Sequence, residues 1–552
     1  MVDNATNKAA AFPDPFRAGL ASGWKAVDAS RLTGDLALDC DVCIVGSGAG
    51  GGVVAEVLAR AGLVVVIVEE GPLRTSSDFR MLESEAYPDL YQESAARKTA
   101  DKAINILQGR CVGGGTTVNW TSSFRTPDAT LAHWARVHRL EGYSPGELEP
   151  WFAKMERRLS IAPWDVPPNE NNAALARGAA RVGIASALIR RNVRGCANLG
   201  YCGVGCPLNA KQSMLVTTIP EALARGATLL TRARAQRLVI ERDRVTTLEC
   251  VAMDASGTSA TTLRVLVRAK TFVSAAGAIG TPALLLRSGV PDPNGLIGKR
   301  TFLHPTIVSA AIMPQRVDGF NGAPQTVYSD HFLDTMPPEG PIGFKLEAPP
   351  VHPILAAITL PGHGPTHASF MRRMANLHVQ IALLRDGFHP ESPGGVVRLR
   401  DDGTPVLDYP LTPYVWEGVR RSFRTMAELQ FAAGATEVMP IHGAGTSFTS
   451  YSAAKHGIDA FALAPLVTPV VSAHVMGGCA MGRDERRTAV DLAGRIHHLA
   501  NAYVVDGSLF PTSIGANPQL SIYAIAARLA EGIAATLKSQ SGISGQSAPQ
   551  LV

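Results

Sequence analysis

The sequence predicts a mixed α/β fold in which a Rossmann-like domain is joined to a second domain built on an antiparallel sheet. The first observation is a strand, a glycine loop, a helix and a second strand that follow one another within residues 40–70. The second is a change of character at residues 312–464, where many prolines accompany alternating pieces such as residues 378–384. The third is the composition, because 46% hydrophobic and 18% charged residues suit a sizeable buried core.

Each element of the first unit has its own signal. Residues 40–45 are apolar and β-branched, as in a buried parallel strand, and residues 46–52 are rich in glycine. Residues 53–61 have the apolar spacing of a helix. Residues 63–68 form a second buried strand that ends at Glu69. Together they predict one βαβ unit.

Later segments continue this pattern. We expect strands at residues 228–240, 263–275 and 503–505, with a polar turn between the first two, and helices at residues 277–288 and 521–537. The nucleotide-binding domain is expected to comprise residues 39–125, 205–311 and 465–538, and the second domain residues 126–204 and 312–464. Residues 1–38 are expected to be an irregular leader, and residues 539–552 a disordered tail.

Charge and composition exclude several classes of protein. A net charge of +5 over 552 residues, with no basic tract, predicts no nucleic-acid partner. No uninterrupted run approaches the roughly 18 apolar residues of a membrane helix, so no transmembrane segment is expected. Eight cysteines in so long a chain do not make a disulfide scaffold, and the N-terminus lacks the apolar core of a secretory signal. A soluble cytoplasmic enzyme is expected, with peripheral membrane association left open.

The first glycine loop has the spacing of a dinucleotide-binding motif. Gly46 permits a tight turn, Gly48 allows the backbone to approach a pyrophosphate, and Gly51 allows the helix to pack on the strand. The N-terminus of the following helix offers free N–H groups to the phosphates. Glu69 lies 23 residues after Gly46, where an acidic side chain accepts from a ribose hydroxyl. A dinucleotide is therefore expected here.

Three further motifs follow in a fixed order. Residues 109–120 include three consecutive glycines, which suit neither a helix nor a strand and suggest a backbone pressed against a flat or anionic ligand. Residues 277–289 begin with a second glycine turn, and residues 474–478 and 506–518 contain His-x-x-Gly-Gly and Asp-Gly-Ser with Asn-Pro. With these motifs the sequence resembles the glucose-methanol-choline (GMC) family of flavoprotein oxidoreductases from about residue 39 to residue 537.

The resemblance implies FAD as the cofactor. Its diphosphate would lie on the first glycine loop, and its ring system along the triple-glycine segment at residues 109–120. Residue by residue, the expected FAD contacts are Glu69 with the adenosine ribose, the backbone of Ala235 with adenine, Gly114, Gly115 and Asn119 with the flavin, and Asp506 and Gly507 with the ribityl chain and pyrophosphate. Some relatives attach the flavin covalently through a histidine, but Gln108 stands at that position, so non-covalent FAD is expected.

The same resemblance implies oxidation of an alcohol to an aldehyde or ketone, with hydride transfer to flavin N5. His474 is expected to be the catalytic base, because an imidazole with a reference pKa near 6.5 can remove an alcohol proton at neutral pH. Asn517 is expected at the second catalytic position. Since an amide cannot act as a base, Asn517 would hydrogen-bond the substrate oxygen and orient the carbinol C–H.

Cys196, Cys202 and Cys206 form a three-thiol loop that is open to two interpretations. They could hold an iron–sulfur cluster, as in some GMC sugar dehydrogenases of similar spacing. However, the fatty-alcohol branch of the family also has Cys-Gly-x-Gly-Cys followed by Lys-Gln-Ser, and Lys211 begins that tripeptide here. In that case the thiols would merely shape a loop.

A long-chain or hydrophobic alcohol is therefore the expected substrate. One alternative is an iron–sulfur-containing FAD sugar or polyol dehydrogenase that passes electrons to a partner, and another is a lyase in which FAD undergoes no net redox change. The motifs do not distinguish an oxidase from a dehydrogenase, nor oxygen, a quinone or a carrier protein as the electron acceptor. They do not indicate the oligomeric state.

Overall fold

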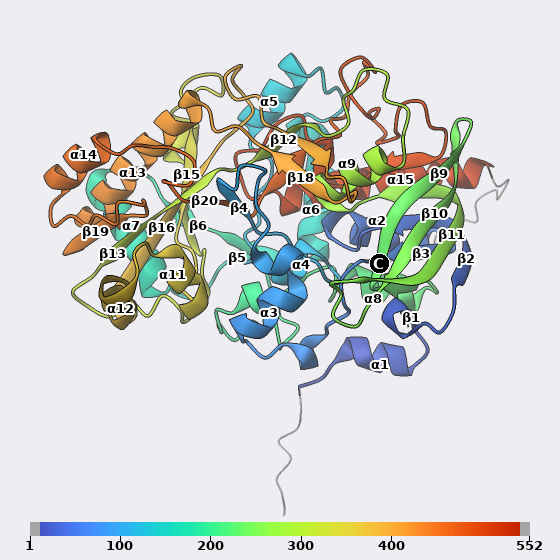
Figure 1. The fold of residues 1–552 in the computed structure, drawn as a ribbon, viewed down its shortest axis with the longest axis horizontal. Coiled ribbons are helices and arrows are strands. Elements are labelled where there is room, and N and C mark those ends of the chain that lie inside the picture. Colours follow the sequence, from blue (N-terminus) through green and yellow to red (C-terminus); the bar gives the residue numbers. More distant parts are fainter. Residues whose placement is uncertain (1–11, 541–552) are drawn as a thin grey trace, which may run out of the picture.

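The structure, a computed structural model, describes residues 12–540 and contains two large sheets joined by a smaller one (Figure 1). The first large sheet has the strand order β1-β8-β3-β2-β11-β10-β9, and β22 pairs with β11. Pairing is parallel from β1 to β11 and antiparallel in the β11-β10-β9 meander. The strands are β1 (Lys25–Asp28), β2 (Leu36–Val45), β3 (Val65–Val68), β8 (Thr228–Thr231), β9 (Ala233–Glu241), β10 (Arg244–Met253), β11 (Ala260–Ser274) and β22 (Ala502–Val504).

The predicted βαβ unit and the mixed α/β class are confirmed. Helix α2 (Ala49–Arg60) connects β2 to β3, and β3 is buried along its whole length. Two local expectations are wrong. Strand β10 occupies much of the predicted polar turn, because its exposed residues alternate with buried ones that meet β9 and β11. Within the described part of the leader, α1 (Pro15–Ala21) and β1 are regular, and β1 pairs with β8.

The second large sheet is antiparallel except where β20 meets β4. Its order is β4-β20-β13-β16-β15-β14-β6, with β19 on β13. Helices α13 (Pro413–Ala433) and α7 (Glu170–Val182) cover one face, while α11 (Pro353–Thr359) and α12 (Gly364–Arg372) lie over the other (Figure 1). The strands are β4 (Ile104–Ile106), β6 (Ala187–Leu188), β13 (Thr306–Ile312), β14 (Val327–Ser329), β15 (Phe344–Glu347), β16 (Leu377–Leu384), β19 (Glu437–Pro440) and β20 (Val470–Ser472).

A four-stranded antiparallel sheet lies between the two and has the order β18-β17-β12-β21. It is built from β12 (Lys299–Leu303), β17 (Gly395–Leu399), β18 (Pro405–Asp408) and β21 (Val475–Gly477). Helix α9 (Gly277–Arg287), predicted at this place, packs against β17, β18 and β21. The chain leaves this sheet at β12 to enter β13, and it returns from β20 to β21, so the small sheet links the two larger ones.

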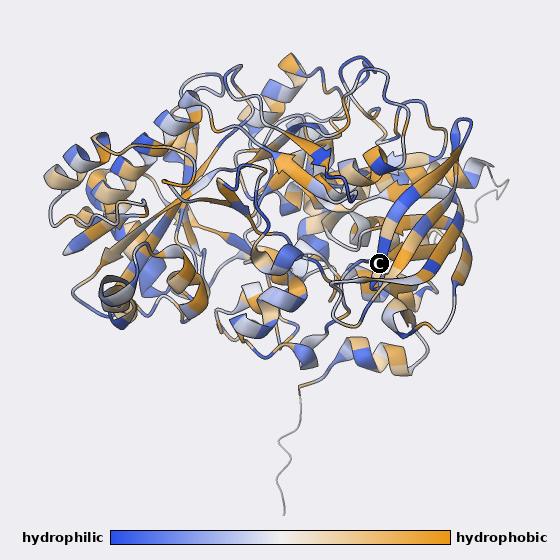
Figure 2. Cartoon of the chain, viewed as in Figure 1, coloured by the Kyte–Doolittle hydropathy of each residue, from blue (hydrophilic) through white to orange (hydrophobic). Residues whose placement is uncertain are grey.

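Hydrophobic residues gather along the strands and on the helices that cover them (Figure 2), in separate clusters for the two large sheets. The predicted C-terminal helix is α15 (Gln519–Gln540), which packs on α2 and on α6 (Pro145–Arg158). By length and composition α15 could cross a membrane, although 67% of its most apolar window is buried inside the structure. A buried core helix meets the same criteria. The first two residues of the predicted disordered tail, 539 and 540, belong instead to α15, and the remainder from 541 onwards lies outside the described residues.

Two glycines on α2 bring the start and the end of the chain together. A Cβ atom at Gly51 would lie 1.9 Å from the carbonyl oxygen of Gly46, so this helix packs directly on the turn that precedes it. A Cβ atom at Gly50 would lie 1.8 Å from the carbonyl oxygen of Val505, the residue that follows β22. The predicted packing role of Gly51 is therefore present, and Gly50 performs the same role for the C-terminal segment.

We predict that Gly50→Ala lowers the free energy of unfolding by about 1–3 kcal/mol, because the added methyl group forces two backbones apart. The matched control is Gly532→Ala in α15, where a Cβ atom would meet nothing within 4 Å. That substitution should raise stability by about 0.5–1 kcal/mol through helix propensity. Thermal unfolding followed by circular dichroism measures both, and a Gly50→Ala protein as stable as the control would contradict the proposed contact.

Candidate active site

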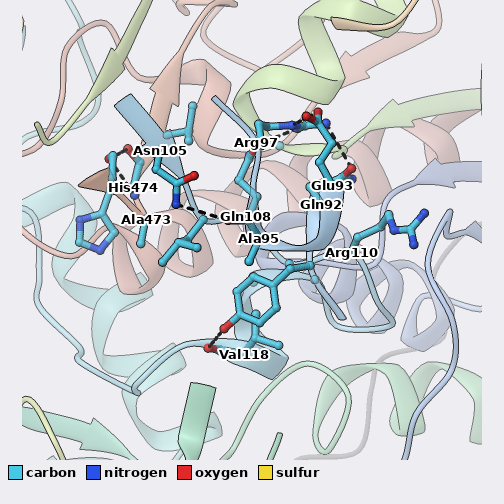
Figure 3. A pocket seen from close by; sticks show the side chains of 18 of the residues that line it. Gln92, Glu93, Ala95, Arg97, Asn105, Gln108, Arg110, Val118, Ala473 and His474 are labelled. Atoms are coloured by element: carbon cyan, nitrogen blue, oxygen red, sulfur yellow. Dashed lines mark hydrogen bonds and ion pairs between the residues drawn. The ribbon is translucent and has the colours of Figure 1, made fainter. Parts of the chain in front are cut away.

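A cavity of about 1290 Å³ is lined by residues from the predicted motifs and from the second large sheet. Gly46, Gly48, Glu69, Gly114, Gly115, Asn119, Ala235, Asp506, Gly507, His474 and Asn517 all contribute to its wall. Figure 3 shows part of this wall, with His474 on one side of the pocket and Arg110 on the other. Residues that are hundreds of positions apart in sequence therefore share one space.

The first glycine loop presents its backbone to the cavity. Gly46 has a φ of +99°, which permits the turn between β2 and α2. Gly48 precedes the first turn of α2, and a Cβ atom there would find only the Cα of Gly114, at 3.9 Å. The free N–H groups at the start of α2 are thus open to an anionic ligand.

Ser47 connects this loop to Glu69 and to the second glycine segment. Its backbone N–H and hydroxyl donate to one carboxylate oxygen of Glu69 at 3.1 and 2.6 Å, and its Oγ accepts from Gly113 N at 3.0 Å. The other carboxylate oxygen accepts from Gly71 N at 2.8 Å. Burial raises the pKa of Glu69. Each carboxylate oxygen can accept more than one hydrogen bond, so Glu69 retains capacity for a ligand hydroxyl.

The second glycine segment meets the first directly. A Cβ atom at Gly114 would lie 3.0 Å from the Cα of Gly48, and its φ of +51° with ψ of −139° is a conformation available mainly to glycine. Gly115 begins the short helix α4 (Gly115–Val118), and a Cβ atom there would meet nothing within 4 Å. This segment therefore offers bare backbone to the cavity, as expected for a surface on which a flat group can lie.

Buried side chains hold the end of this segment. Asn119 donates from Nδ2 to Gln519 Oε1 at 2.7 Å. Lys211 donates from Nζ to the carbonyl oxygens of Thr117, Asn119 and Cys202 at 2.6, 2.9 and 2.7 Å. Burial lowers the pKa of Lys211 to about 8. Its three hydrogen bonds fix the position of Asn119 relative to the cysteine loop.

Asp506 fastens the C-terminal segment to α9. One carboxylate oxygen accepts from Gly277 N at 2.9 Å and from the Thr281 hydroxyl at 2.6 Å, and the other accepts from Ser508 N and Oγ at 2.8 and 2.5 Å. Burial raises the pKa of this carboxyl group. These hydrogen bonds to Gly277, Thr281 and Ser508 hold Asp506 and the next residue, Gly507, in the cavity wall.

Ala235 reaches the cavity from β9 at the edge of the first sheet. Its carbonyl oxygen accepts from the Arg287 guanidinium at 3.1 Å, which holds this edge against α9. Gln108 also lines the cavity, and its Oε1 accepts from Arg97 at 2.9 Å. A side-chain amide is no nucleophile for a flavin, so a dissociable cofactor stays the prediction.

His474 is positioned by the strands on either side of it in the chain. It lies between β20 and β21, and the partner strand β12 ends at Leu303, which pairs with Val475. The residue that follows β12 is His304, so the two imidazoles meet, with 3.0 Å between their Nδ1 atoms. Burial and then the nearby Lys345 ammonium lower the pKa of His474 to about 4. His474 is therefore neutral at physiological pH.

The tautomers of this pair follow from one backbone group. Gly515 N donates to His304 Nε2 at 3.1 Å, so the proton of neutral His304 resides on Nδ1 and is donated to His474 Nδ1. His474 then carries its own proton on Nε2. To accept a substrate proton on that nitrogen, His474 requires His304 to adopt its other tautomer and release Gly515.

Asn517 belongs to a buried network that the sequence motifs do not reveal. Its Nδ2 lies 3.5 Å from Glu347 Oε2, which also accepts from Gln325 Nε2 at 2.7 Å. Asn517 Oδ1 and Glu347 Oε1 are buried without a hydrogen-bond partner. Burial raises the pKa of Glu347 to about 7. An unsatisfied amide oxygen in the cavity wall is suited to a hydrogen-bond donor on a ligand.

The cysteine loop contributes no metal site to this cavity. Among the described residues, no group of three or more His, Cys, Asp or Glu side chains is placed to hold a metal ion. Cys202 Sγ accepts instead from Arg191 at 3.7 Å, and the Cys202 carbonyl is held by Lys211. The hypothesis of a cluster on Cys196, Cys202 and Cys206 therefore gains no support, and the loop is held by hydrogen bonds to buried cations.

Comparison with known proteins agrees with the motifs. Two family models described as GMC oxidoreductase match residues 87–306 and 390–526. A GMC-type oxidoreductase of Sinorhizobium fredii, named as uncharacterized, is 31% identical over 91% of this chain and 95% of its own length. A long-chain-alcohol oxidase of Arabidopsis thaliana is 29% identical over 94% of this chain and 71% of its own length.

Solved structures share the fold. Pyridoxine 4-oxidase from Mesorbium loti matches with a TM-score of 0.64 at 19% identity, over 89% of this chain and 99% of that chain. A formate oxidase variant from Aspergillus oryzae matches with a TM-score of 0.68 at 14% identity, over 92% of this chain and 100% of that chain. From the two family models and the relatives that span nine-tenths of its length, we conclude that the chain belongs to the GMC oxidoreductase family.

Proposed function

We propose that this protein binds FAD non-covalently and oxidises an alcohol, with a hydrophobic alcohol as its substrate. The observation that carries the proposal is the shared cavity, in which His474 and Asn517 line the same space as both glycine segments. Members of the GMC family bind FAD. Relatives named long-chain-alcohol oxidases match nearly the whole chain and support an alcohol as the substrate.

The residues of the cavity fit FAD. The N-terminus of α2 with Gly48 would receive the diphosphate, and Glu69 the adenosine ribose. Ala235 lies at the strand edge where adenine would bind, and Gly114 and Gly115 form a bare backbone surface for the flavin. Bound FAD would supply the acceptor for the hydride that the alcohol loses.

The protein would supply orientation and proton transfer. The alcohol oxygen would lie between His474 and the unsatisfied amide oxygen of Asn517, which can accept the hydroxyl hydrogen bond. The hydroxyl would then turn from Asn517 Oδ1 to His474 Nε2 and pass its proton to that nitrogen. This step requires the tautomer of His474 that carries its own proton on Nδ1 and donates it to His304 Nδ1, while the His304 proton lies on Nε2 and Gly515 N is released. Glu347, when ionised, accepts from Asn517 Nδ2 and fixes the direction in which the amide oxygen points.

An apolar arm of the cavity supports a hydrophobic substrate. In the β13–β16 ladder, Val308 pairs with Ile381 and Ala310 with Val379, and all four residues line the cavity. The same register begins at Thr306, two residues after His304. At about 3.3 Å per residue, this aliphatic wall extends about 13 Å from Thr306 to Ala310. Burial of an alkyl chain against such a wall is favourable by about 0.8 kcal/mol per methylene.

The role of His474 is tested by two substitutions. We expect His474→Ala to bind FAD and to reduce it with alcohol at least about 100-fold more slowly under anaerobic stopped-flow conditions. His474→Gln restores a hydrogen-bond donor but no base, so it should be equally slow. Wild-type rates in the alanine variant would remove His474 from the mechanism, and recovery in the glutamine variant would assign it a donor role only.

Glu347 is predicted to set the pH dependence of flavin reduction. Because its pKa is about 7, its carboxylate form and the hold on Asn517 are lost as the pH falls below that value. The rate should therefore rise with pH through about 7, by up to about tenfold per unit on the acid side. Glu347→Gln should flatten the profile between about pH 6 and about pH 8, because His474 has a pKa of about 4 and does not titrate there. An unchanged profile in this variant would contradict the assignment.

The apolar arm is predicted to select for chain length. Val379→Phe places a ring against the middle of the arm, so KM for a long-chain alcohol should rise at least about tenfold while a short alcohol is little affected. The control is Val64→Phe on the exposed surface, where the side chain is 56% exposed. Equal effects of Val379→Phe on long and short alcohols would show that the alkyl chain does not occupy this arm.

A further inference from the structure

Exposed aliphatic side chains gather at the outer end of the apolar arm. Ile358 and Leu466 are 70% and 71% exposed, and Ile354 is 38% exposed, yet all three line the cavity. Val467, next in the chain, is also 38% exposed. We call these four residues the rim. Single exposed aliphatic residues are ordinary, but a group of them around the mouth of one cavity marks an interaction surface.

The rim is a continuation of the cavity wall. Gly443 N donates to the carbonyl oxygen of Val467 at 2.7 Å, and Ile441 N donates to that of Val308 at 2.9 Å, so the Leu466 segment is tied to β13. On the other side, Ala356 of α11 belongs to the same hydrophobic cluster as Val308 and Ile441. In Figure 1, α11 lies beside α12 at the end of the molecule opposite the β9–β11 meander.

The charge of both rim segments is unusual for a protein surface. Residues 348–385 contain no Asp or Glu, although they include the exposed Arg372 on α12. Residues 460–473 contain no ionisable side chain. Among the described residues, carboxylates from other elements reach these segments only in paired form: the buried Glu83 accepts from the N–H groups of Ile354 and Leu355, and Glu437 is paired with Arg373. Two segments that are aliphatic at their centre and carry no acidic side chain complement a lipid bilayer, whose interface accepts apolar side chains and whose headgroups are often anionic.

We propose that the rim inserts into the interface of a lipid bilayer, so that a membrane-dissolved alcohol enters the apolar arm without passing through water. The insertion itself stands on the exposure, continuity and charge of the rim, whereas the identity of the molecule that enters rests on the proposed function. A long-chain alcohol partitions into lipid, so an opening in water would leave the arm away from its substrate.

The test is flotation of the full-length holoprotein with vesicles of phosphatidylcholine alone or of phosphatidylcholine with phosphatidylglycerol. We expect the wild-type protein to float with vesicles. In the double variant Ile358→Asp/Leu466→Asp, the partition coefficient should fall at least about tenfold, because two apolar side chains become charged at the interface. The control variant Val64→Asp/Leu188→Asp replaces aliphatic residues that are 56% and 47% exposed and do not line the cavity, and it should float like wild type.

Several outcomes would overturn the proposal. One is a wild-type protein that stays unbound with both kinds of vesicle, and another is a rim variant that floats as well as wild type. Binding that needs phosphatidylglycerol and is unaffected by the rim substitutions would show a purely electrostatic association. A dimer in vesicle-free buffer that the rim substitutions dissociate would assign the surface to a second copy of the chain. Flotation needs no turnover, so a failure of the proposed alcohol oxidation would leave its outcome unchanged.

Discussion

The close approach of α2 to two backbone segments is the constraint on which the site depends. Gly51 lets the helix pack on the carbonyl of Gly46, and Gly50 lets it pack on the carbonyl of Val505. A side chain at Gly51 would push α2 away from the glycine loop, and one at Gly50 would push it away from Val505, the residue that follows β22. Because Asp506 follows Val505 and is bonded to the start of α9, the same contact brings the N-terminus of a second helix to the cavity.

The small sheet performs the corresponding task for the second large sheet. Strand β12 of this sheet continues into β13, and β20 leads into β21. The β12–β21 ladder therefore brings His304 and His474 to the boundary between the two large sheets. The side of the cavity formed by the first large sheet is thus mostly backbone and glycine, while the other side has the His474 imidazole, backed by His304, followed by an aliphatic wall. This division suits a site in which a large polar ligand lies against one large sheet and an apolar ligand lies against the other.

Local signals explain which features the sequence predicts. The βαβ unit is visible because turn glycines and buried strands are encoded within about thirty residues, and His474 and Asn517 are found through the family resemblance. His304 and Glu347 carry no such signal, because their importance arises from side-chain contacts with residues far away in the chain, His304 with His474 and Glu347 with Asn517. Strand β10 was hidden for a similar reason, since its polar positions resemble a turn until its neighbours on both sides are known.

The absorbance spectrum of the purified protein, recorded before and after denaturation and filtration, tests the central claim most directly. We expect a yellow protein with equimolar FAD, and we expect all of the flavin in the filtrate because Gln108 offers no covalent attachment. A colourless protein that takes up no added FAD would contradict a flavin site on the two glycine segments. Flavin retained with the denatured chain would contradict the assigned non-covalent mode of binding.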